Sequence, residues 1–124
     1  DFWSNYTGVQ ALKTLADIKK KISIDEIHEA ISRVGLEPKD KRTTRKYSLG
    51  MIQRLGIAQA IMEKPDILLL DEPTNGLDKS GVVIVEDIIK EEAKRGATVI
   101  LASHIINDLN LCHKLIELDN GGVI

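Results

Sequence analysis

The first part of the chain repeats apolar residues at the spacing of a helix. Within residues 8–21 they recur every third or fourth position, at Val9, Leu12, Leu15, Ala16 and Ile18. This period predicts an amphipathic helix, and Thr7 is a suitable N-cap for it. Ser23 and Glu26 then form the S-x-x-E pattern of a capping box. The apolar residues that follow predict a second helix, which Gly35 is expected to end.

A polar stretch separates these helices from the rest of the chain. Residues 37–46 contain Pro38 and five basic side chains. We interpret the stretch as a solvated loop, and a phosphate-binding patch is the alternative. The next helix is expected to begin at Ser48 and to end before Pro65.

The second part of the chain alternates between helices and strands. Residues 67–70 form a continuous apolar run, typical of a strand buried on both faces. Residues 80–95 predict a helix with two ion pairs at i,i+4, Glu86–Lys90 and Glu91–Arg95, and with Gly96 as its terminator.

A second buried strand is expected at residues 98–101, followed by a short helix at 105–111. Residues 115–118 and 123–124 flank Asn120-Gly121, a sequence favoured in hairpin turns. The order of strands and helices predicts a doubly wound α/β sheet, in which ligands bind at the carboxyl ends of the strands.

Composition and charge narrow the classes of function. The 124 residues carry 17 Lys and Arg against 19 Asp and Glu, a net charge of −2, which argues against nucleic-acid binding by bulk positive charge. The longest apolar runs are far shorter than the roughly 20 residues of a membrane-spanning helix. Cys112 is the single cysteine and no zinc-ligand spacing occurs. These features are typical of a soluble, reduced, intracellular protein.

Charged and polar residues follow both predicted strands. Asp71 and Glu72 come directly after the first strand, and this pair suits metal-assisted phosphoryl transfer, in which one carboxylate holds Mg²⁺ and its neighbour orients water. The alternative is a strand that ends in a charged turn. His104 follows the second strand, where it could contact a phosphate or be an ordinary loop residue.

A third candidate lies at the start of the helix that Ser48 opens. The helix N-terminus favours an anion, and Gly50 lets a phosphate approach closely. Taken alone, Ser48 is better explained as a plain N-cap.

Together these segments resemble the ATP-binding subunit of an ABC transporter. Residues 47–58 are similar to the signature motif and its helix, residues 67–72 to Walker B, and residues 75–78 to the D-loop. Ser103-His104 is similar to the switch histidine. The resemblance implies a partial RecA-like P-loop NTPase core at residues 48–124, with a C-terminal hairpin, and an ABC-type helical subdomain at residues 1–47.

The resemblance also implies roles for these residues. Ser48 and Gly50 would bind the γ-phosphate of ATP held by a second subunit. Leu49, Met51 and Asp78 would also belong to the ATP-binding residues. Asp71 would position Mg²⁺, Glu72 would polarise the attacking water, and His104 would contact the γ-phosphate. Asp78 would carry communication across the dimer. A transmembrane permease would be the partner, with the ATPase at the cytoplasmic face of the membrane and no nucleic acid involved.

The chain departs from the family pattern at several positions. Leu49 and Met51 replace a Gly and the Gln of the usual Leu-Ser-Gly-Gly-Gln signature, a form similar to bacitracin- and lantibiotic-type exporters. We have no account of Ile52, which replaces a residue that is commonly polar or basic in that form.

The phosphate-binding loop is absent from these residues. The printed sequence contains no G-x-x-x-x-G-K-[ST] and no Q-loop glutamine, and the chain looks as if it starts just after that glutamine. The chain alone is therefore expected to be inactive and to self-associate through an uncovered strand. Two alternatives stay open, a soluble ABC-type ATPase that acts on ribosomes and a truncated, non-catalytic interaction module.

Overall fold

The computed structural model describes residues 2–19, 22–103, 118–119 and 122–123. A short 3₁₀ helix, η1 (Phe2–Asn5), precedes the helices α1 (Gly8–Lys19) and α2 (Ile24–Arg33). A second 3₁₀ helix, η2 (Thr44–Lys46), leads into α3 (Leu49–Met62). The strands β1 (Ile67–Asp71) and β2 (Thr98–Ala102) flank α4 (Lys79–Arg95). The strands β3 (Leu118–Asp119) and β4 (Gly122–Val123) come last.

The caps predicted for the first two helices are present. Thr7 Oγ1 accepts a hydrogen bond from the Gln10 amide at 3.1 Å, and Gln10 Oε1 accepts one from the Thr7 amide at 3.0 Å. Ser23 and Glu26 form the predicted capping box at the start of α2. Gly35 follows the end of that helix with a φ of +80°, a left-handed conformation that glycine adopts readily.

The polar stretch at residues 37–46 is held by its own contacts. Arg42 forms an ion pair with Asp40 at 2.7 Å and lies 5.9 Å from the centroid of the Tyr47 ring.

Arg45 donates to Asn5 Oδ1 at 2.6 Å, and the Thr44 amide donates to the Tyr6 carbonyl at 2.6 Å. These bonds join η2 to η1 and favour a structural loop over a phosphate-binding patch.

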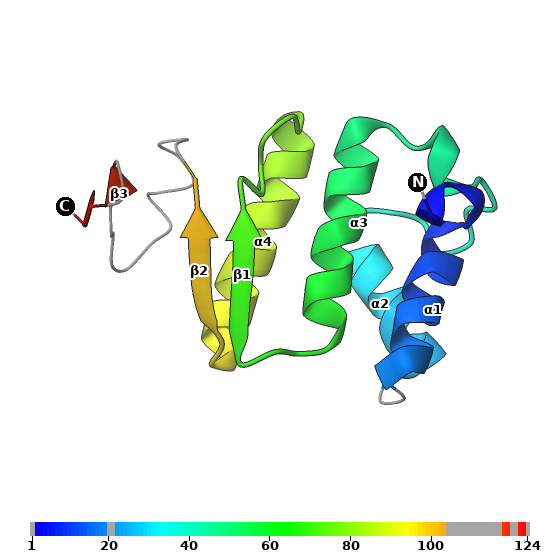
Figure 1. Cartoon of the computed structure of the whole chain (residues 1–124), viewed down its shortest axis with the longest axis horizontal. Helices are drawn as coiled ribbons and strands as arrows, with labels where there is room; N and C mark the ends of the chain where they lie inside the picture. Colours follow the sequence, from blue (N-terminus) through cyan, green and yellow to red (C-terminus); the bar gives the residue numbers. More distant parts are fainter. Residues whose placement is uncertain (1, 20–21, 104–117, 120–121, 124) are drawn as a thin grey trace.

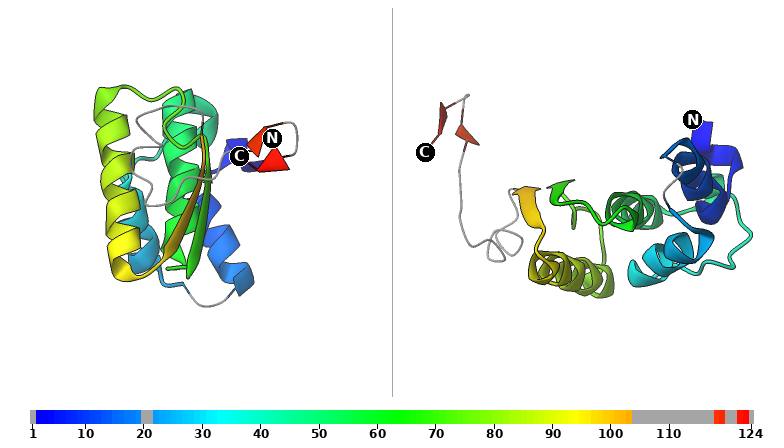
Figure 2. Two further views of the ribbon diagram at one scale, coloured as in Figure 1. Left: turned by 90° about the vertical axis from the view of Figure 1, so that its left-hand side faces the viewer. Right: turned by 90° about the horizontal axis from the view of Figure 1, so that it is seen from below.

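The strands β1 and β2 pair in parallel, with Ile67 opposite Thr98 and Asp71 opposite Ala102. The helix α4 connects them and covers one face of the sheet, while α3 lies beside β1 (Figures 1 and 2). Parallel strands joined by a helix were predicted. An arrangement with helices on both faces is not seen among the residues that the structure describes.

The prediction that both strands are buried on both faces is wrong. Leu68 and Leu70 are buried, whereas Ile67 and Leu69 are 64% and 67% exposed. On β2, Ile100 is 47% exposed. Successive side chains of a strand point to opposite faces, and within the described residues only one face has a helix packed on it.

One continuous core joins the helices to the sheet. It contains buried side chains from α1, α2, α3, β1 and α4, among them Leu12, Ile27, Ile61, Leu68 and Val85. The core therefore crosses the boundary predicted at residues 47 and 48. That division into a helical subdomain and an ATP-binding core stays a prediction.

The C-terminal pairing agrees with the predicted hairpin. β3 and β4 are antiparallel, with Leu118 opposite Val123 and Asp119 opposite Gly122. The predicted turn at Asn120-Gly121, the helix at 105–111 and most of the strand at 115–118 lie outside the described residues. Among the helices that the structure does describe, none combines the length and the apolar character needed to cross a bilayer.

Candidate functional site

Ser48 is the N-cap of α3. Its backbone is extended, and its Oγ accepts a hydrogen bond from the Met51 amide at 3.1 Å. The side chain is therefore held over the first turn of the helix, where backbone N–H groups lack helical acceptors. This geometry supports the N-cap interpretation directly. It also places Ser48 at the N-terminal end of the helix, which attracts anions.

The first turn of α3 packs against the loop at residues 75–78. A Cβ atom on Gly50 would lie 3.4 Å from Leu77 Cδ2 and 3.9 Å from the Gly76 carbonyl oxygen. Gly76 has a φ of +79°, and a Cβ there would lie 3.8 Å from Leu49 Cδ2. The fold thus brings together the segments that resemble the signature motif and the D-loop. Leu49 itself is 76% exposed.

Asp71 and Glu72 lie at the carboxyl end of β1, as predicted. Asp71 is the last residue of the strand and is exposed. Glu72 turns the chain sharply with a φ of +48°, a left-handed conformation that is uncommon for a residue with a side chain. Its amide donates to the Ala102 carbonyl on β2 at 2.6 Å.

The carbonyl oxygen of Glu72 accepts two hydrogen bonds. The Asn75 amide donates one at 3.1 Å, which closes a tight turn. Gln53 Nε2, from α3, donates the other at 2.8 Å. Gln53 received no role from sequence reasoning, because no local pattern relates a helix side chain to a backbone carbonyl 19 residues away.

Asp78 is the N-cap of α4. Its Oδ1 accepts hydrogen bonds from the Gly81 amide at 2.9 Å and from Ser80 Oγ at 3.1 Å. The Gly81 amide is the main cause that holds the pKa of Asp78 below its ordinary value, and the Ser80 hydroxyl adds to the effect. The role predicted for Asp78, communication across a dimer, stays a prediction. His104 lies outside the described residues.

The carboxylates at the end of β1 are suitable ligands for Mg²⁺. This ion is usually bound by one or two carboxylates together with phosphate oxygens and water. Asp71 supplies such a carboxylate, with Glu72 next to it in the chain, and no group of three or more metal-ligating side chains occurs in the described part of the chain. The donor set therefore fits Mg²⁺ that arrives with a nucleotide better than an ion held in an all-protein cage.

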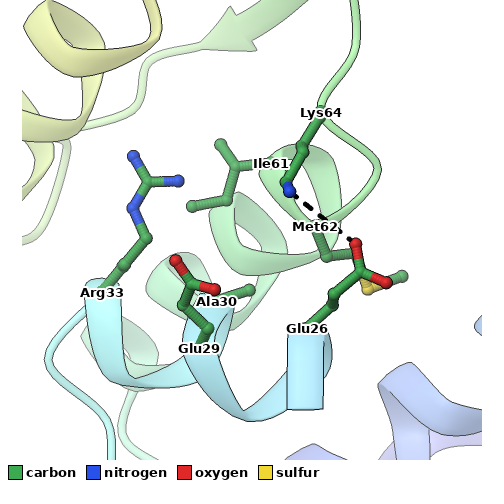
Figure 3. A pocket seen from close by; sticks show the side chains of 7 residues that line it. All are labelled: Glu26, Glu29, Ala30, Arg33, Ile61, Met62 and Lys64. Carbon is green, nitrogen blue, oxygen red and sulfur yellow. Dashed lines mark ion pairs between the residues drawn. The ribbon is translucent and has the colours of Figure 1, made fainter. Parts of the chain in front are cut away.

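Two of the hollows among the described residues lie beside α3. A groove of about 220 Å³ runs between α3 and β1 and reaches Gln53, Asp71 and Pro73. The other hollow, of about 20 Å³, lies between α2 and the end of α3, where Lys64 and Glu26 form an ion pair at 3.9 Å (Figure 3). The smaller hollow has room for about one water molecule, so we assign it no ligand.

The described fold is a parallel α/β unit with paired carboxylates at a strand end and a capped helix nearby, an arrangement typical of nucleotide-binding domains. A family model described as "ABC transporter" matches residues 3–75, more than half of the chain. The chain belongs to the ABC transporter family.

Curated relatives agree with this membership. The chain is 53% identical over 117 residues to the ABC transporter ATP-binding protein YybJ of Bacillus subtilis, covering 94% of this chain and 54% of the relative. It is 39% identical to the bacitracin transport ATP-binding protein BcrA of Enterococcus faecalis, covering 87% and 35%. The lantibiotic transport ATP-binding protein SrtF of Streptococcus pyogenes is 37% identical, with 84% and 46% covered. The chain thus spans about half the length of these relatives or less.

Solved structures agree on the fold. A bacterial ABC transporter cassette determined as a dimer matches with a TM-score of 0.87 and 24% identity, covering 97% of this chain and 55% of that one. The same cassette, in a post-hydrolysis state bound to ADP and Pi, gives the same score. The predicted fold class, a partial P-loop NTPase core with helices and parallel strands, is confirmed.

Proposed function

We propose that this chain is part of the ATP-hydrolysing subunit of an ABC transporter. The subunit would act as a head-to-tail dimer and would couple ATP binding and hydrolysis to export through a partner membrane subunit. The proposal rests on the packing of the first turn of α3 against residues 75–78. That segment follows the paired carboxylates, Asp71 and Glu72, at the end of β1. Three segments that resemble ABC motifs are thereby assembled in one fold.

Each candidate residue would have a separate role in ATP binding or hydrolysis. Ser48 and Gly50, with Leu49 and Met51, would bind the γ-phosphate of ATP held by the second subunit, because the first turn of α3 presents amides to an anion. Asp71 would hold Mg²⁺, which neutralises charge on the phosphates when it is bound. Glu72 would accept a proton from the attacking water, and His104 would contact the γ-phosphate.

The proposed cargo is a drug or a peptide. Support comes from the relatives that are named for bacitracin and lantibiotic transport and from the shared departure at Leu49 and Met51. The printed residues contain no G-x-x-x-x-G-K-[ST], whose backbone amides and Lys hold the β-phosphate. We therefore infer that these 124 residues need the remainder of the subunit, and a second subunit, for turnover.

The test is Glu72→Gln in the complete ATP-binding subunit. The amide keeps the size of the side chain but accepts no proton at neutral pH, so ATP turnover should fall by about 100-fold or more while ATP still binds. Glu29→Gln on the exposed side of α2 is the control and should retain turnover. Unchanged turnover in Glu72→Gln would remove Glu72 from this role. A complete protein that neither binds nor hydrolyses ATP would favour a non-catalytic interaction module.

A further inference from the structure

Gln53 joins the helix that begins after Ser48 to the backbone of Glu72. Its Nε2 donates to the Glu72 carbonyl oxygen at 2.8 Å, and the bond is partly buried. A hydrogen bond that is partly shielded from water is stronger than an exposed one. The contact is therefore a firm link between α3 and the end of β1.

The backbone of Glu72 needs such a link. Among the described residues other than glycine, positive φ values occur at Glu72 and at Lys64. A side chain disfavours this left-handed conformation, so the surrounding bonds must hold it in place. Two of them come from nearby in the fold, the β2 carbonyl of Ala102 and the Asn75 amide of the turn. Gln53 supplies the third from a separate helix.

The direction of the Glu72 carboxylate depends on this backbone. The carbonyl group and Cβ are attached to the same Cα, so a change of φ, the strained dihedral of Glu72, moves the carbonyl and swings the side chain together. A proton acceptor must lie within hydrogen-bond reach of its water, and displacements of about 1 Å can cost on the order of 100-fold in rate. A hydrogen bond that holds the Glu72 carbonyl therefore influences the direction of the Glu72 carboxylate without contacting it.

We propose that Gln53 is a positioning residue for Glu72, and that it ties the direction of this carboxylate to the helix that carries Ser48. The inference rests on the proposed ATPase function. Binding of phosphate at the first turn of α3 would act on the same rigid helix from which Gln53 holds Glu72. Gln53 would thus link two sites of one subunit. One is the first turn of α3, which would bind the γ-phosphate of ATP held by the partner, and the other is the proton acceptor Glu72.

The test compares three variants of the complete subunit. Gln53→Leu keeps a similar side-chain size and removes the donor, whereas Gln53→Lys keeps a donor of similar reach. Gln59→Leu changes an exposed glutamine on the same helix and is the control. The steady-state kcat and the KM for ATP are measured separately, together with the thermal unfolding midpoint of each variant.

We expect Gln53→Leu to lower kcat about tenfold, the effect of one lost positioning bond, while its KM and unfolding midpoint match those of Gln59→Leu. Gln53→Lys should recover most of the lost kcat. An unchanged kcat in Gln53→Leu would overturn the inference but leave the ATPase function standing. A fall in kcat matched by a raised KM and a lower midpoint would overturn it too, in favour of a purely structural bond. An inactive wild-type subunit would instead reject the proposed function, and this inference with it.

Discussion

Arg33 of α2 donates a hydrogen bond from Nη2 to Oε2 of Glu92 on α4 at 3.1 Å, and the Glu92 side chain is only 3% exposed. Arg95 donates to the other carboxylate oxygen at 3.0 Å, and its guanidinium also reaches the Pro65 carbonyl at 2.6 Å. The buried carboxylate therefore joins the helical part of the chain to the unit that carries β1. A buried charge is tolerated only with partners of this kind.

Two adjacent glutamates allow a matched test of this ion pair. Glu91 also contacts Arg33, at 3.4 Å, but its side chain is 62% exposed. Glu92→Ala removes the buried carboxylate that Arg33 and Arg95 share and leaves Arg33 with its exposed contact to Glu91, so the free energy of unfolding should fall by about 2 kcal/mol. Glu91→Ala should change it by less than about 0.5 kcal/mol, because solvent screens an exposed pair. Urea unfolding measures both, and equal losses would show that burial does not set the strength of this contact.

The sequence anticipated some of these contacts and missed others for physical reasons. Caps at Thr7, Ser23, Ser48 and Gly35 depend on neighbours in the chain, so local pattern located the helix ends well. The predicted Glu91–Arg95 pair was wrong, because Arg95 pairs with Glu92, a residue that the core buries. Residues three and four apart both lie close together on a helix, so the sequence allows Arg95 to pair with Glu92 or with Glu91. Tertiary packing selects Glu92.

The same limit applies to the candidate site. The order of the motifs located Ser48, Gly50, Asp71 and Glu72, because each lies at the end of an element that local pattern defines. An unbroken apolar run could not reveal which face of β1 is covered. The Gln53 bond to Glu72 depends on how α3 lies beside β1, which no single segment encodes.

Ser48 offers a way to separate helix capping from phosphate binding. Its Oγ caps α3 by accepting from the Met51 amide, and aspartate caps a helix about as well as serine. Ser48→Asp should therefore unfold at the wild-type temperature, while the added carboxylate repels a γ-phosphate and lowers ATPase activity by at least about tenfold.

Ser48→Ala completes this comparison. It removes the cap at a cost of about 1 kcal/mol, without adding charge. Activity and thermal unfolding are measured for both variants in the complete subunit with its dimer partner. Full activity in Ser48→Asp would show that Ser48 acts as a cap alone.

The cap at Asp78 predicts a dependence of stability on acid. Hydrogen bonds from the Gly81 amide, and then from Ser80, hold the pKa of Asp78 below its ordinary value in the folded chain. A carboxyl whose pKa is lowered by folding stabilises the fold above its unfolded pKa, and that contribution is lost as the pH falls through the folded pKa. The loss should begin below a pH of about 4.

Asp78→Asn isolates this contribution because asparagine caps a helix without titrating. The difference in unfolding midpoint between wild type and Asp78→Asn should be largest near neutral pH and should shrink as the pH falls toward about 3. Thermal unfolding across this range measures the difference. A difference that stays constant with pH would show that the charge of Asp78 contributes nothing to the cap.

One face of the sheet has no helix packed on it within the described residues, and this makes a prediction for the 124-residue chain by itself. Ile67, Leu69 and Ile100 place exposed apolar side chains on one face. Contiguous apolar surface of this kind drives association, so the isolated chain should form dimers or larger species. Leu69→Lys puts a charge at the centre of the face and should shift the chain toward monomer. Val83→Lys, at a 54% exposed position on α4, is the control and should leave association unchanged. Light scattering at several concentrations gives the mass, and a wild-type chain that is monomeric throughout would contradict the prediction.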